Sequence, residues 1–329
     1  MSGIRTISGG ITAPQGFRAA GVACGIKARG GLDLAIVAST SGATAAAVFT
    51  TNKAVAAPVV LSRQQLADAG GRMSAIVVNS GCANACTGSR GFEDAVQMTR
   101  LTAAALGVDP TGVLVASTGV IGVALDMTAV ERGITAAAAA LAPDGGADAA
   151  RAIMTTDPFP KEAASEITIA SGVFRVGGIA KGSGMIEPNM ATMLGFVTTD
   201  AAVAPGLLQR ALKAAVDGTF NAITVDGECS TNDCVFVLAN GASGVSIDEA
   251  DFASLVEALV AVCRPLAIGI VRGGEGATKL ITVQVTGGTS DQDARRAARA
   301  IANSLLVKTA IHGGDPNWGR LVAVAGRSG

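Results

Sequence analysis

Aromatic residues are scarce in this 329-residue sequence, which contains one tryptophan, no tyrosine and only 3% aromatics in all. Such a chain offers few rings on which nucleic-acid bases could stack. Charge is also sparse and balanced, with 25 Lys and Arg against 26 Asp and Glu, so the basic surplus typical of nucleic-acid-binding domains is missing. These two absences exclude nucleic acid from the expected partners.

Long apolar runs are missing as well. The longest uncharged stretch of note, residues 110–125, is shorter than the roughly 20 residues that a membrane-spanning helix needs, and glycines interrupt it. The first 16 residues lack the apolar core of a signal peptide. The six cysteines are not spaced as zinc-binding pairs, so we expect reduced, mostly buried thiols. We therefore expect a soluble, cytoplasmic protein with no membrane partner.

Strand and helix patterns alternate along a chain that is 49% hydrophobic and holds 43 glycines. Apolar runs bounded by turn residues predict strands at 32–38, 58–62, 75–79, 113–117, 235–238 and 279–285, and a hairpin at 167–180 that turns at Ser171-Gly172. Helical spacing predicts helices at 92–106, 128–141, 205–216, 247–262 and 291–305, the fourth ending before Pro265. This mixture indicates an α/β (α+β) fold. A weak boundary near 240–245 indicates two units, 1–243 and a smaller α/β unit at 244–329.

The single histidine, His312, restricts the chemistry that an enzyme on this chain could use. Histidine is the usual general base near neutral pH. His312 stands at the end of an apolar run, where a structural role is the better interpretation. An enzyme would then need another base: a carboxylate, a lysine or a chain-terminal amine.

Three polar segments are candidates for a site. Residues 181–200 begin Lys-Gly-Ser-Gly and pass through a Pro-Asn turn into a strand, but they match no phosphate-binding glycine motif. A second segment carries three acids whose spacing is not that of a calcium loop, so we expect no metal; these acids are Asp226, Glu228 and Asp233. Glu275 lies in a glycine-rich turn, which is either a solvated turn or an approach for a ligand.

Taken together, six long motifs resemble one family, the ornithine acetyltransferase (glutamate N-acetyltransferase) family of arginine biosynthesis. The motifs are collinear and cover essentially the whole chain. They lie at residues 117–122 (Ser-Thr-Gly-Val-Ile-Gly), 181–185 (Lys-Gly-Ser-Gly-Met), 190–194 (Met-Ala-Thr-Met-Leu), 224–233, 274–279 (Gly-Glu-Gly-Ala-Thr-Lys) and 314–320 (Gly-Asp-Pro-Asn-Trp-Gly-Arg).

The resemblance implies an enzyme that cuts its own chain between Ala191 and Thr192. The fragments 1–191 and 192–329 would stay associated as α and β chains of an αβ heterotetramer. The implied fold is an αββα layered one, like that of N-terminal-nucleophile hydrolases, followed by a smaller C-terminal α/β domain. A threonine nucleophile suits a chain with one histidine, because cleavage gives it an α-amine whose reference pKa is about 7.7–8.0.

The implied reaction is ping-pong acetyl transfer from N-acetylornithine to glutamate, without a cofactor and with acetyl-CoA as a further candidate donor. Thr192 would attack the acetyl carbonyl, and Thr118 with the Gly119 N–H would stabilise the oxyanion. The substrate-binding residues implied are Thr156, Lys181, Glu275 and Thr192 itself. A lysine suits the carboxylate that both amino acids carry, and a glutamate suits a substrate ammonium.

Two departures from the family pattern stand out. Pro158 occupies a position where a further substrate-binding threonine is expected, which removes a hydroxyl and a backbone donor. Family members also continue past residues 314–320 with a tail that carries a substrate-binding asparagine and a hydroxyl residue. The resemblance therefore implies a partial sequence, partly self-cleaved, poorly soluble and weak in acetyl transfer.

Two alternatives remain open for the function. One is an aminopeptidase or amidase on a related self-cleaving scaffold, which hands its acyl group to water. Lys181 and Glu275 argue against it, because they would build a site for a charged amino acid. The other alternative is an inactive truncated homologue, or a protein that only binds.

Overall fold

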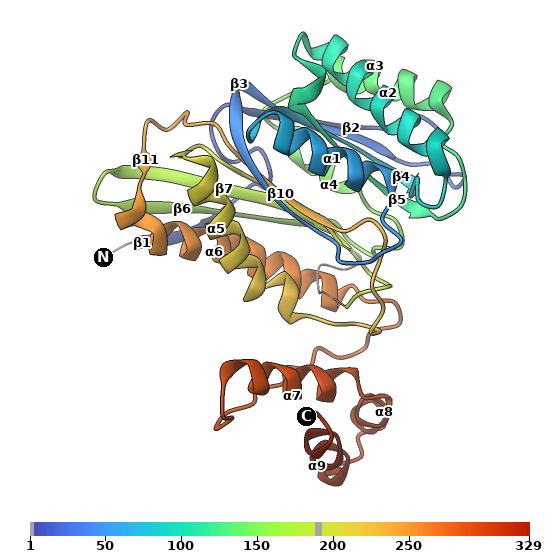
Figure 1. The fold of residues 1–329 in the computed structure, drawn as a ribbon, viewed down its shortest axis with the longest axis vertical. Coiled ribbons are helices and arrows are strands. Elements are labelled where there is room, and N and C mark those ends of the chain that lie inside the picture. Colours follow the sequence, from blue (N-terminus) through green and yellow to red (C-terminus); the bar gives the residue numbers. More distant parts are fainter. Residues whose placement is uncertain (1–2, 188–192) are drawn as a thin grey trace.

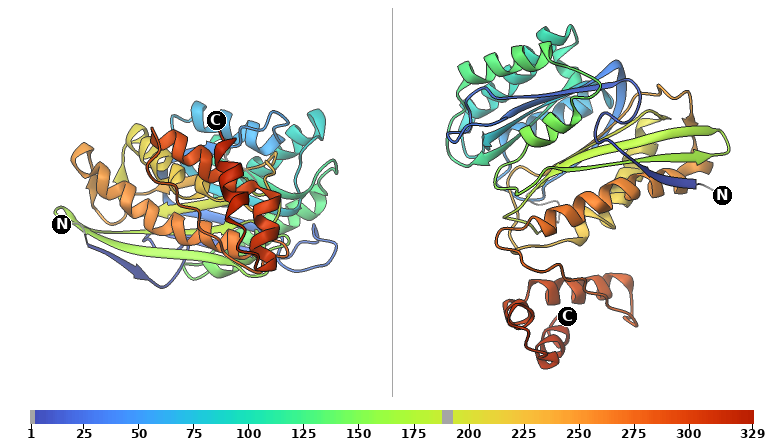
Figure 2. Two further views of the ribbon diagram at one scale, coloured as in Figure 1. Left: turned by 90° about the horizontal axis from the view of Figure 1, so that it is seen from below. Right: turned by 180° about the vertical axis from the view of Figure 1, so that it is seen from behind.

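A computed structural model of the chain describes residues 3–187 and 193–329. Apart from a helical unit at the C-terminal end, these residues form four layers in the order helix, sheet, sheet, helix (Figure 1, Figure 2). The strands of the inner layers are β1 Gly3–Ile7, β2 Phe17–Val22, β3 Leu34–Phe49, β4 Arg72–Cys82, β5 Val113–Val120, β6 Lys161–Ile169, β7 Gly172–Lys181, β8 Leu194–Thr199 and β10 Cys234–Ala239. The helices are α1 Ala57–Asp68, α2 Gly88–Leu106, α3 Met127–Ala139, α4 Gly146–Ala152, α5 Pro205–Asp217, α6 Phe252–Arg272, α7 Asp291–Asn303, α8 Leu305–Gly313 and α9 Trp318–Gly326. The layered fold expected from the sequence is confirmed.

The long strand β3 links the two inner layers in one hydrogen-bonded path. The strand order along that path is β1-β6-β7-β8-β10-β3-β4-β5, and β2 pairs with the first half of β3. The register of β3 against β4 shifts between Ala38 and Ala43, and beyond that point β3 pairs with β10. We call the layer of β2, β4, β5 and the first half of β3 the β4 layer, and the other strands the β8 layer.

Side chains along each central strand alternate between two cores, as the two-residue period of a strand requires. In β4, Ile76 and Val78 point into the core between the two layers, whereas Ala75 and Val77 point into the core beneath α2 and α3. In β10, Phe236 points into the central core and its neighbours point toward α5 and α6. Both faces of these strands are therefore covered, and their sequences are almost continuously apolar.

The helices cover the outer faces of the two layers. Helices α1, α2 and α3 pack on the β4 layer, and α5 and α6 pack on the β8 layer (Figure 2). The short helix α4 contributes its alanines to the central core and contacts β2, β3 and β7. A separate two-stranded sheet, β9 Ala202–Val203 with β11 Ser246–Ile247, lies beside the β8 layer.

Residues 58–62, predicted as a strand, form the first turns of helix α1, so that prediction is wrong. Pro58 occupies the start of the helix, where its fixed φ and its missing N–H cost little. Buried Ser62 donates its hydroxyl to Val115 O at 2.7 Å and accepts from Val115 N at 2.8 Å. Packing against β5 therefore outweighs the strand propensity of these residues.

Helix α6 continues through Pro265 to Arg272, so the predicted end near residue 262 is wrong. Its buried stripe runs on both sides of the proline, through Leu259, Leu266 and Ile270, and this burial offsets the backbone hydrogen bond that proline cannot make. By length and composition α6 could cross a membrane, a feature that the sequence analysis missed. The buried stripe packs on β6, β7 and α5, which is the setting of a core helix.

The C-terminal residues form a small helical unit of α7, α8 and α9, set apart from the four layers (Figure 1). The predicted helix at 291–305 is confirmed as α7. The predicted strand at 279–285 is wrong, because no strand of the described chain pairs with those residues. The boundary predicted at 243/244 would separate α6 from the sheet that it covers, and it stays a prediction.

The helical unit contacts the layered body through the segment that precedes β10. Thr224 Oγ1 donates to Asn303 Oδ1 at 2.7 Å, and Lys308 Nζ donates to Val225 O at 2.7 Å. Both bonds come from α7 and α8 and reach the same short stretch. The unit is therefore attached beside that stretch, which also supplies residues of the site described below.

The other predicted elements are confirmed. The helices expected at 92–106, 128–141 and 205–216 are α2, α3 and α5, and Gly107 ends α2 with a left-handed φ of 68°. The strands expected at 75–79, 113–117 and 235–238 lie within β4, β5 and β10, and the strand expected at 32–38 overlaps β3, which begins two residues later at Leu34. The hairpin at 167–180 lies within β6 and β7, with its turn at 170–171, one residue before the predicted turn. Four of the six cysteines are buried.

Candidate active site

A cavity of about 1420 Å³ opens at one end of the layers, where β4, β5 and β7 end. Small-molecule pockets usually measure about 300–1,000 Å³, so this cavity has room for more than one amino acid. Its walls come from the loop at 25–32, the ends of β4 and β5, the segment at 154–156 and the residues that follow β7. The predicted site residues that line it are Thr118, Gly119, Thr156, Lys181 and Glu275.

The end of β5 presents Thr118 and Gly119 to the cavity. Gly119 has a φ of 135°, and a Cβ there would lie 2.2 Å from the carbonyl carbon of Gly81, so only glycine allows this close pairing of β4 and β5. Buried Asn232 donates its Nδ2 to Ser117 O at 2.9 Å. The strand end is thus fixed both by backbone packing and by a side-chain amide.

Lys181, the last residue of β7, is buried in the cavity wall with 3% of its surface exposed. Its Nζ donates to Thr118 Oγ1 at 3.2 Å. Burial lowers the pKa of Lys181, while three nearby carboxylates, Asp157 foremost among them, act in the opposite direction. A buried ammonium that lines a cavity is suited to bind the carboxylate of a ligand.

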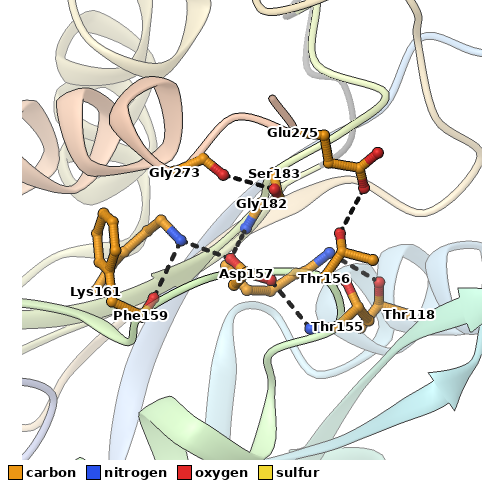
Figure 3. Close-up of polar contacts among 11 residues, drawn as sticks. Thr118, Thr155, Thr156, Asp157, Phe159, Lys161, Gly182, Ser183, Gly273 and Glu275 are labelled. Atoms are coloured by element: carbon orange, nitrogen blue, oxygen red, sulfur yellow. Dashed lines mark hydrogen bonds and ion pairs between the residues drawn. The ribbon is translucent and has the colours of Figure 1, made fainter. Parts of the chain in front are cut away.

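Glu275 and Thr156 form the outer rim of the cavity. Thr156 Oγ1 donates to Glu275 Oε1 at 2.7 Å, and both residues are exposed (Figure 3). The backbone N–H of Glu275 donates to Ser183 O at 3.2 Å, which ties the turn after α6 to the segment after β7. A Cβ on Gly184 would lie 2.8 Å from the carboxyl carbon of Glu275, so glycine at 184 makes room for this carboxylate.

A buried ionic group behind the cavity wall was missed by the sequence analysis. Asp157 Oδ1 accepts from Lys161 Nζ at 2.6 Å and from Gly182 N at 2.7 Å (Figure 3). Burial by itself would raise the pKa of Asp157, but the charges of Lys181 and Lys161 outweigh burial and hold the pKa below its ordinary value. Opposite charges four residues apart usually indicate an exposed ion pair, so the sequence carried little sign of this burial.

The loop at 25–32, which forms another wall, is organised by Asp33. Its fully buried carboxylate accepts the backbone N–H groups of residues 24–27 at 2.7–3.1 Å. Burial would raise the pKa of Asp33, but these hydrogen bonds hold it below its ordinary value. The glycines at 25, 30 and 31, all with positive φ, are the signal in the sequence for a structured loop, which was not predicted above.

Asp226, considered above as a metal ligand, is committed to the backbone. Its carboxylate accepts from Met185 N at 2.6 Å, Ile186 N at 2.8 Å and Glu228 N at 3.1 Å. It thereby holds the turn after β7, in which Met185 has a left-handed φ of 61°. Within residues 3–187 and 193–329 there is no group of three or more His, Cys, Asp or Glu placed to hold a metal ion.

The predicted cleavage site, Ala191 and Thr192, lies outside the described residues. The chain on either side of it is well anchored. Glu187 donates its N–H to Glu228 O at 2.8 Å, and Met193 is buried just before β8. The roles predicted for Ala191 and Thr192 stay predictions.

His312 and Pro158 lie away from the centre of the site. His312 is exposed near the end of α8, and it is not among the described residues that line the cavity. Pro158 is exposed, so the contact expected of a threonine at this position has no counterpart here. The base for any reaction in the cavity must therefore come from another group.

This arrangement places a buried ammonium, a hydroxyl and a tightly paired strand end on one side of the cavity and a carboxylate at its rim. The opposite charges can bind a ligand that itself carries a carboxylate and an ammonium group. The Thr118 hydroxyl and the backbone at Gly119 stand where an oxyanion could be stabilised.

Comparison with known proteins identifies related chains. A model of the ArgJ family matches residues 18–329. The arginine biosynthesis bifunctional protein ArgJ of Symbiobacterium thermophilum is 55% identical over 328 residues, which cover 98% of this chain and 81% of that protein. The protein of the same description from a Synechococcus strain is 56% identical, covering 98% of this chain and 78% of the relative.

Solved structures give the same result. The ornithine acetyltransferase of Mycobacterium tuberculosis, crystallised with ornithine, is 42% identical with a TM-score of 0.52, over 56% of this chain and 98% of that one. An ArgJ structure from Bacillus halodurans is 38% identical with a TM-score of 0.54, over 58% and 99% of the two chains. An aminopeptidase of Ochrobactrum anthropi, described as a variant of the Ntn hydrolase fold, is 13% identical and shares the fold over 89% and 95%, with a TM-score of 0.55.

Proposed function

Because the chain belongs to the ArgJ family, we propose that it is an acyltransferase of arginine biosynthesis that moves the acetyl group of N-acetylornithine to glutamate. The observation that carries the proposal is that the buried Lys181 ammonium and the Glu275 carboxylate line the same cavity. N-acetylornithine carries a carboxylate and a side-chain ammonium, which are the groups that these two residues would bind.

The acceptor needs a second cationic contact, because glutamate has a carboxylate where ornithine has an ammonium. Lys27, Arg29 and Arg151 line the same cavity. Burial lowers the pKa of Lys27, and the Asp33 carboxylate opposes that shift. The presence of these three cations supports the proposal that the cavity binds both amino acids in turn, as a ping-pong reaction requires.

The proposed chemistry uses Thr192 as the nucleophile after cleavage of the Ala191–Thr192 bond. Its hydroxyl oxygen attacks the acetyl carbonyl while its own α-amine accepts the hydroxyl proton. That proton then passes to the departing nitrogen of ornithine, which leaves an acetyl ester on the threonine. The α-amine of glutamate attacks the ester, and its proton returns to the threonine oxygen.

Oxyanion stabilisation is assigned to Thr118 and Gly119. Each tetrahedral intermediate places negative charge on the former carbonyl oxygen, and one well-placed donor can lower the barrier by about 3–4 kcal/mol. The position of both residues at the cavity end of β5 supports this role. Thr156 would orient Glu275 through their hydrogen bond of 2.7 Å.

The test is a turnover assay with N-acetylornithine, run with and without glutamate. The proposal expects ornithine and N-acetylglutamate to form in equal amounts, and little release of acetate when glutamate is left out. Acetate release at the same rate without glutamate would point to a hydrolase instead. No cofactor enters this scheme, and acetyl-CoA is a second donor to test in the same assay.

Assembly and location complete the proposal. We propose that fragments 1–191 and 192–329 remain together as αβ pairs, that two such pairs form a heterotetramer, and that the enzyme works in the cytoplasm. The buried cysteines and the core position of α6 support that location. Light scattering on the purified protein tests the assembly, and a mass near 32.4 kDa would contradict the heterotetramer.

A further inference from the structure

Two lysines and one aspartate are buried together at the wall of the cavity. Lys161, Lys181 and Asp157 are 4%, 3% and 7% exposed. Among these three residues one carboxylate stands against two ammonium groups, with the buried Asp233 as a further carboxylate that acts on Lys181. A buried charge is costly unless it is paired. If one of the two lysines binds the Asp157 carboxylate, the ammonium of the other lysine is therefore left for a different partner.

Asp157 is bound by Lys161. Lys161 Nζ donates to Asp157 Oδ1 at 2.6 Å and to Phe159 O at 3.3 Å, and it lies 4.9 Å from the centre of the Phe159 ring (Figure 3). The end of α6 closes a further side, because a Cβ on Gly273 would lie only 3.3 Å from Nζ. The Lys161 ammonium is therefore fixed in one position.

Lys181 has different partners. Its Nζ donates to Thr118 Oγ1 at 3.2 Å, and its side chain lines the cavity, whereas the described lining includes neither Lys161 nor Asp157. An ammonium group has three N–H donors. Among the described residues the acceptor of Lys181 Nζ is the Thr118 hydroxyl, which leaves two donors for the carboxylate of a ligand.

The charges that act on Lys181 come from several elements. The segment before β6 supplies a carboxylate, the first residue of β6 a cation and the loop after β2 another cation, and the chain before β10 and after α6 supplies one carboxylate each. In that order these groups are Asp157, Lys161, Lys27, Asp233 and Glu275. Burial lowers the pKa of Lys181 and the two other lysines add to that effect, while the carboxylates raise the pKa.

We propose that Lys161 is a positioning residue, which occupies Asp157 so that the Lys181 ammonium remains available to the substrate. The negative charge of Asp157 still favours the charged form of Lys181. Asp157 does not, however, compete with the substrate for the Lys181 N–H groups that face the cavity. This inference rests on the proposed function, because it takes the substrate carboxylate to be the ligand of Lys181.

The alternative arrangement shows what Lys161 prevents. Without the Lys161 cation, Lys181 is the cation best placed to pair with Asp157. A direct pair would turn the Lys181 ammonium from the cavity, and each substrate carboxylate would have to break that pair before it could bind. Hydrogen bonds to charged groups are strong enough for this competition to cost roughly tenfold or more in affinity.

Two single substitutions should shift the pKa of Lys181 in opposite directions. In Lys161→Met, loss of a repelling cation and a new pair with Asp157 raise that pKa. In Asp157→Asn, loss of the carboxylate lowers it, so binding of the substrate carboxylate should be lost at a lower pH than in the wild type. A purely structural role for the pair predicts no such opposite shifts.

The measurement combines binding with a direct titration. Calorimetry gives the Kd of glutamate and of N-acetylornithine across a pH series, and NMR of isotope-labelled lysine side chains follows Lys181 among only seven lysines. We expect Lys161→Met to weaken binding by roughly tenfold or more at neutral pH. The conservative Lys161→Arg variant, which keeps the charge, should bind nearly as the wild type does.

The double variant Asp157→Asn/Lys161→Met gives the sharpest result. If Lys161 only prevents competition by Asp157, removing the aspartate as well should restore much of the affinity that Lys161→Met loses, at pH values where Lys181 is charged. Independent structural damage would instead add up. Lys213→Met is the matched control, because Lys213 forms an exposed pair with Asp217 on α5.

Three outcomes overturn the proposal: a wild-type Kd in Lys161→Met, a Lys181 pKa that falls in that variant, or a double variant that binds more weakly than Lys161→Met. Thermal unfolding of each variant shows whether it is folded. If Lys161→Met does not fold, the comparison of Lys161→Arg, Asp157→Asn and the double variant decides. If even the wild type binds neither amino acid, the proposed function fails. The Lys181 titration still tests whether Lys181 pairs with Asp157 once Lys161 is removed.

Discussion

The Thr118 hydroxyl accepts a hydrogen bond from Lys181 and lines the cavity at the end of β5. Thr118→Ala should slow acetyl transfer by about 10²–10³ with little change in KM, because the bond to the oxyanion forms mainly in the transition state. Measured kcat and KM for N-acetylornithine check this, with Thr118→Ser as the control that keeps the hydroxyl. A rise in KM at unchanged kcat would assign Thr118 to substrate binding.

Thr192 tests the chemistry of cleavage. Thr192→Ala should remain one chain of 329 residues, because no hydroxyl is left to attack the preceding carbonyl, while Thr192→Ser can still be processed. Mass spectrometry of the denatured proteins distinguishes one species from the fragments 1–191 and 192–329. The same two fragments from purified Thr192→Ala would show that an outside protease makes the cut.

Gly119 tests whether the close pairing of β4 and β5 at the cavity depends on glycine. Gly119→Ala should lower the free energy of unfolding by roughly 3 kcal/mol or more, because the new Cβ would lie 2.2 Å from Gly81 at a φ of 135°. Gly122→Ala is the matched control, since it also has a positive φ but no atom within 4 Å of the new Cβ. Urea unfolding measures both, and equal losses would contradict the close approach.

At the scale of elements, the loop at 25–32 depends on one carboxylate. The pKa of Asp33 is lowered in the folded chain, so its contribution to stability is present above the unfolded pKa of about 3.9 and is lost as the pH falls further. Asp33→Asn should lower the free energy of unfolding by roughly 2 kcal/mol at pH 7. Urea unfolding at pH 7 and near pH 3 checks this, and a difference that does not shrink in acid would rule out the charged carboxylate as the cause.

Predictions for elements succeeded where local pattern and packing agree. Helix α2 has a clear apolar stripe and a glycine stop, and the strands β4 and β10 contain short apolar runs, so each was found from the sequence. Helices α1 and α6 were misjudged for one reason. In both, burial against a sheet outweighs a local signal, the strand propensity of residues 58–62 in one case and Pro265 in the other.

At the scale of the whole molecule, the sheet predicts that cleavage does not release the fragments. β8 and β10 would belong to the second fragment, yet β8 pairs with β7 and β10 pairs with β3 of the first. The two fragments should therefore stay together in native mass spectrometry and separate only in denaturant. Dissociation under native conditions would contradict this prediction, which depends on the central position of β8 and β10 in the sheet.

The sequence by itself determined the alternation of strands and helices, the presence of a single histidine and the motifs that hold Thr118, Lys181 and Glu275. These properties depend on residue type and on neighbours along the chain, so local patterns carry them. Only the tertiary structure decided that those residues share one cavity, because Lys181 and Thr118 are 63 residues apart and Thr156 and Glu275 are 119 apart. The burial of Asp157 with Lys161 was decided in the same way. An aspartate and a lysine four residues apart give the same sequence pattern whether the pair is exposed or buried. Only the residues that pack around the pair determine whether water can reach it.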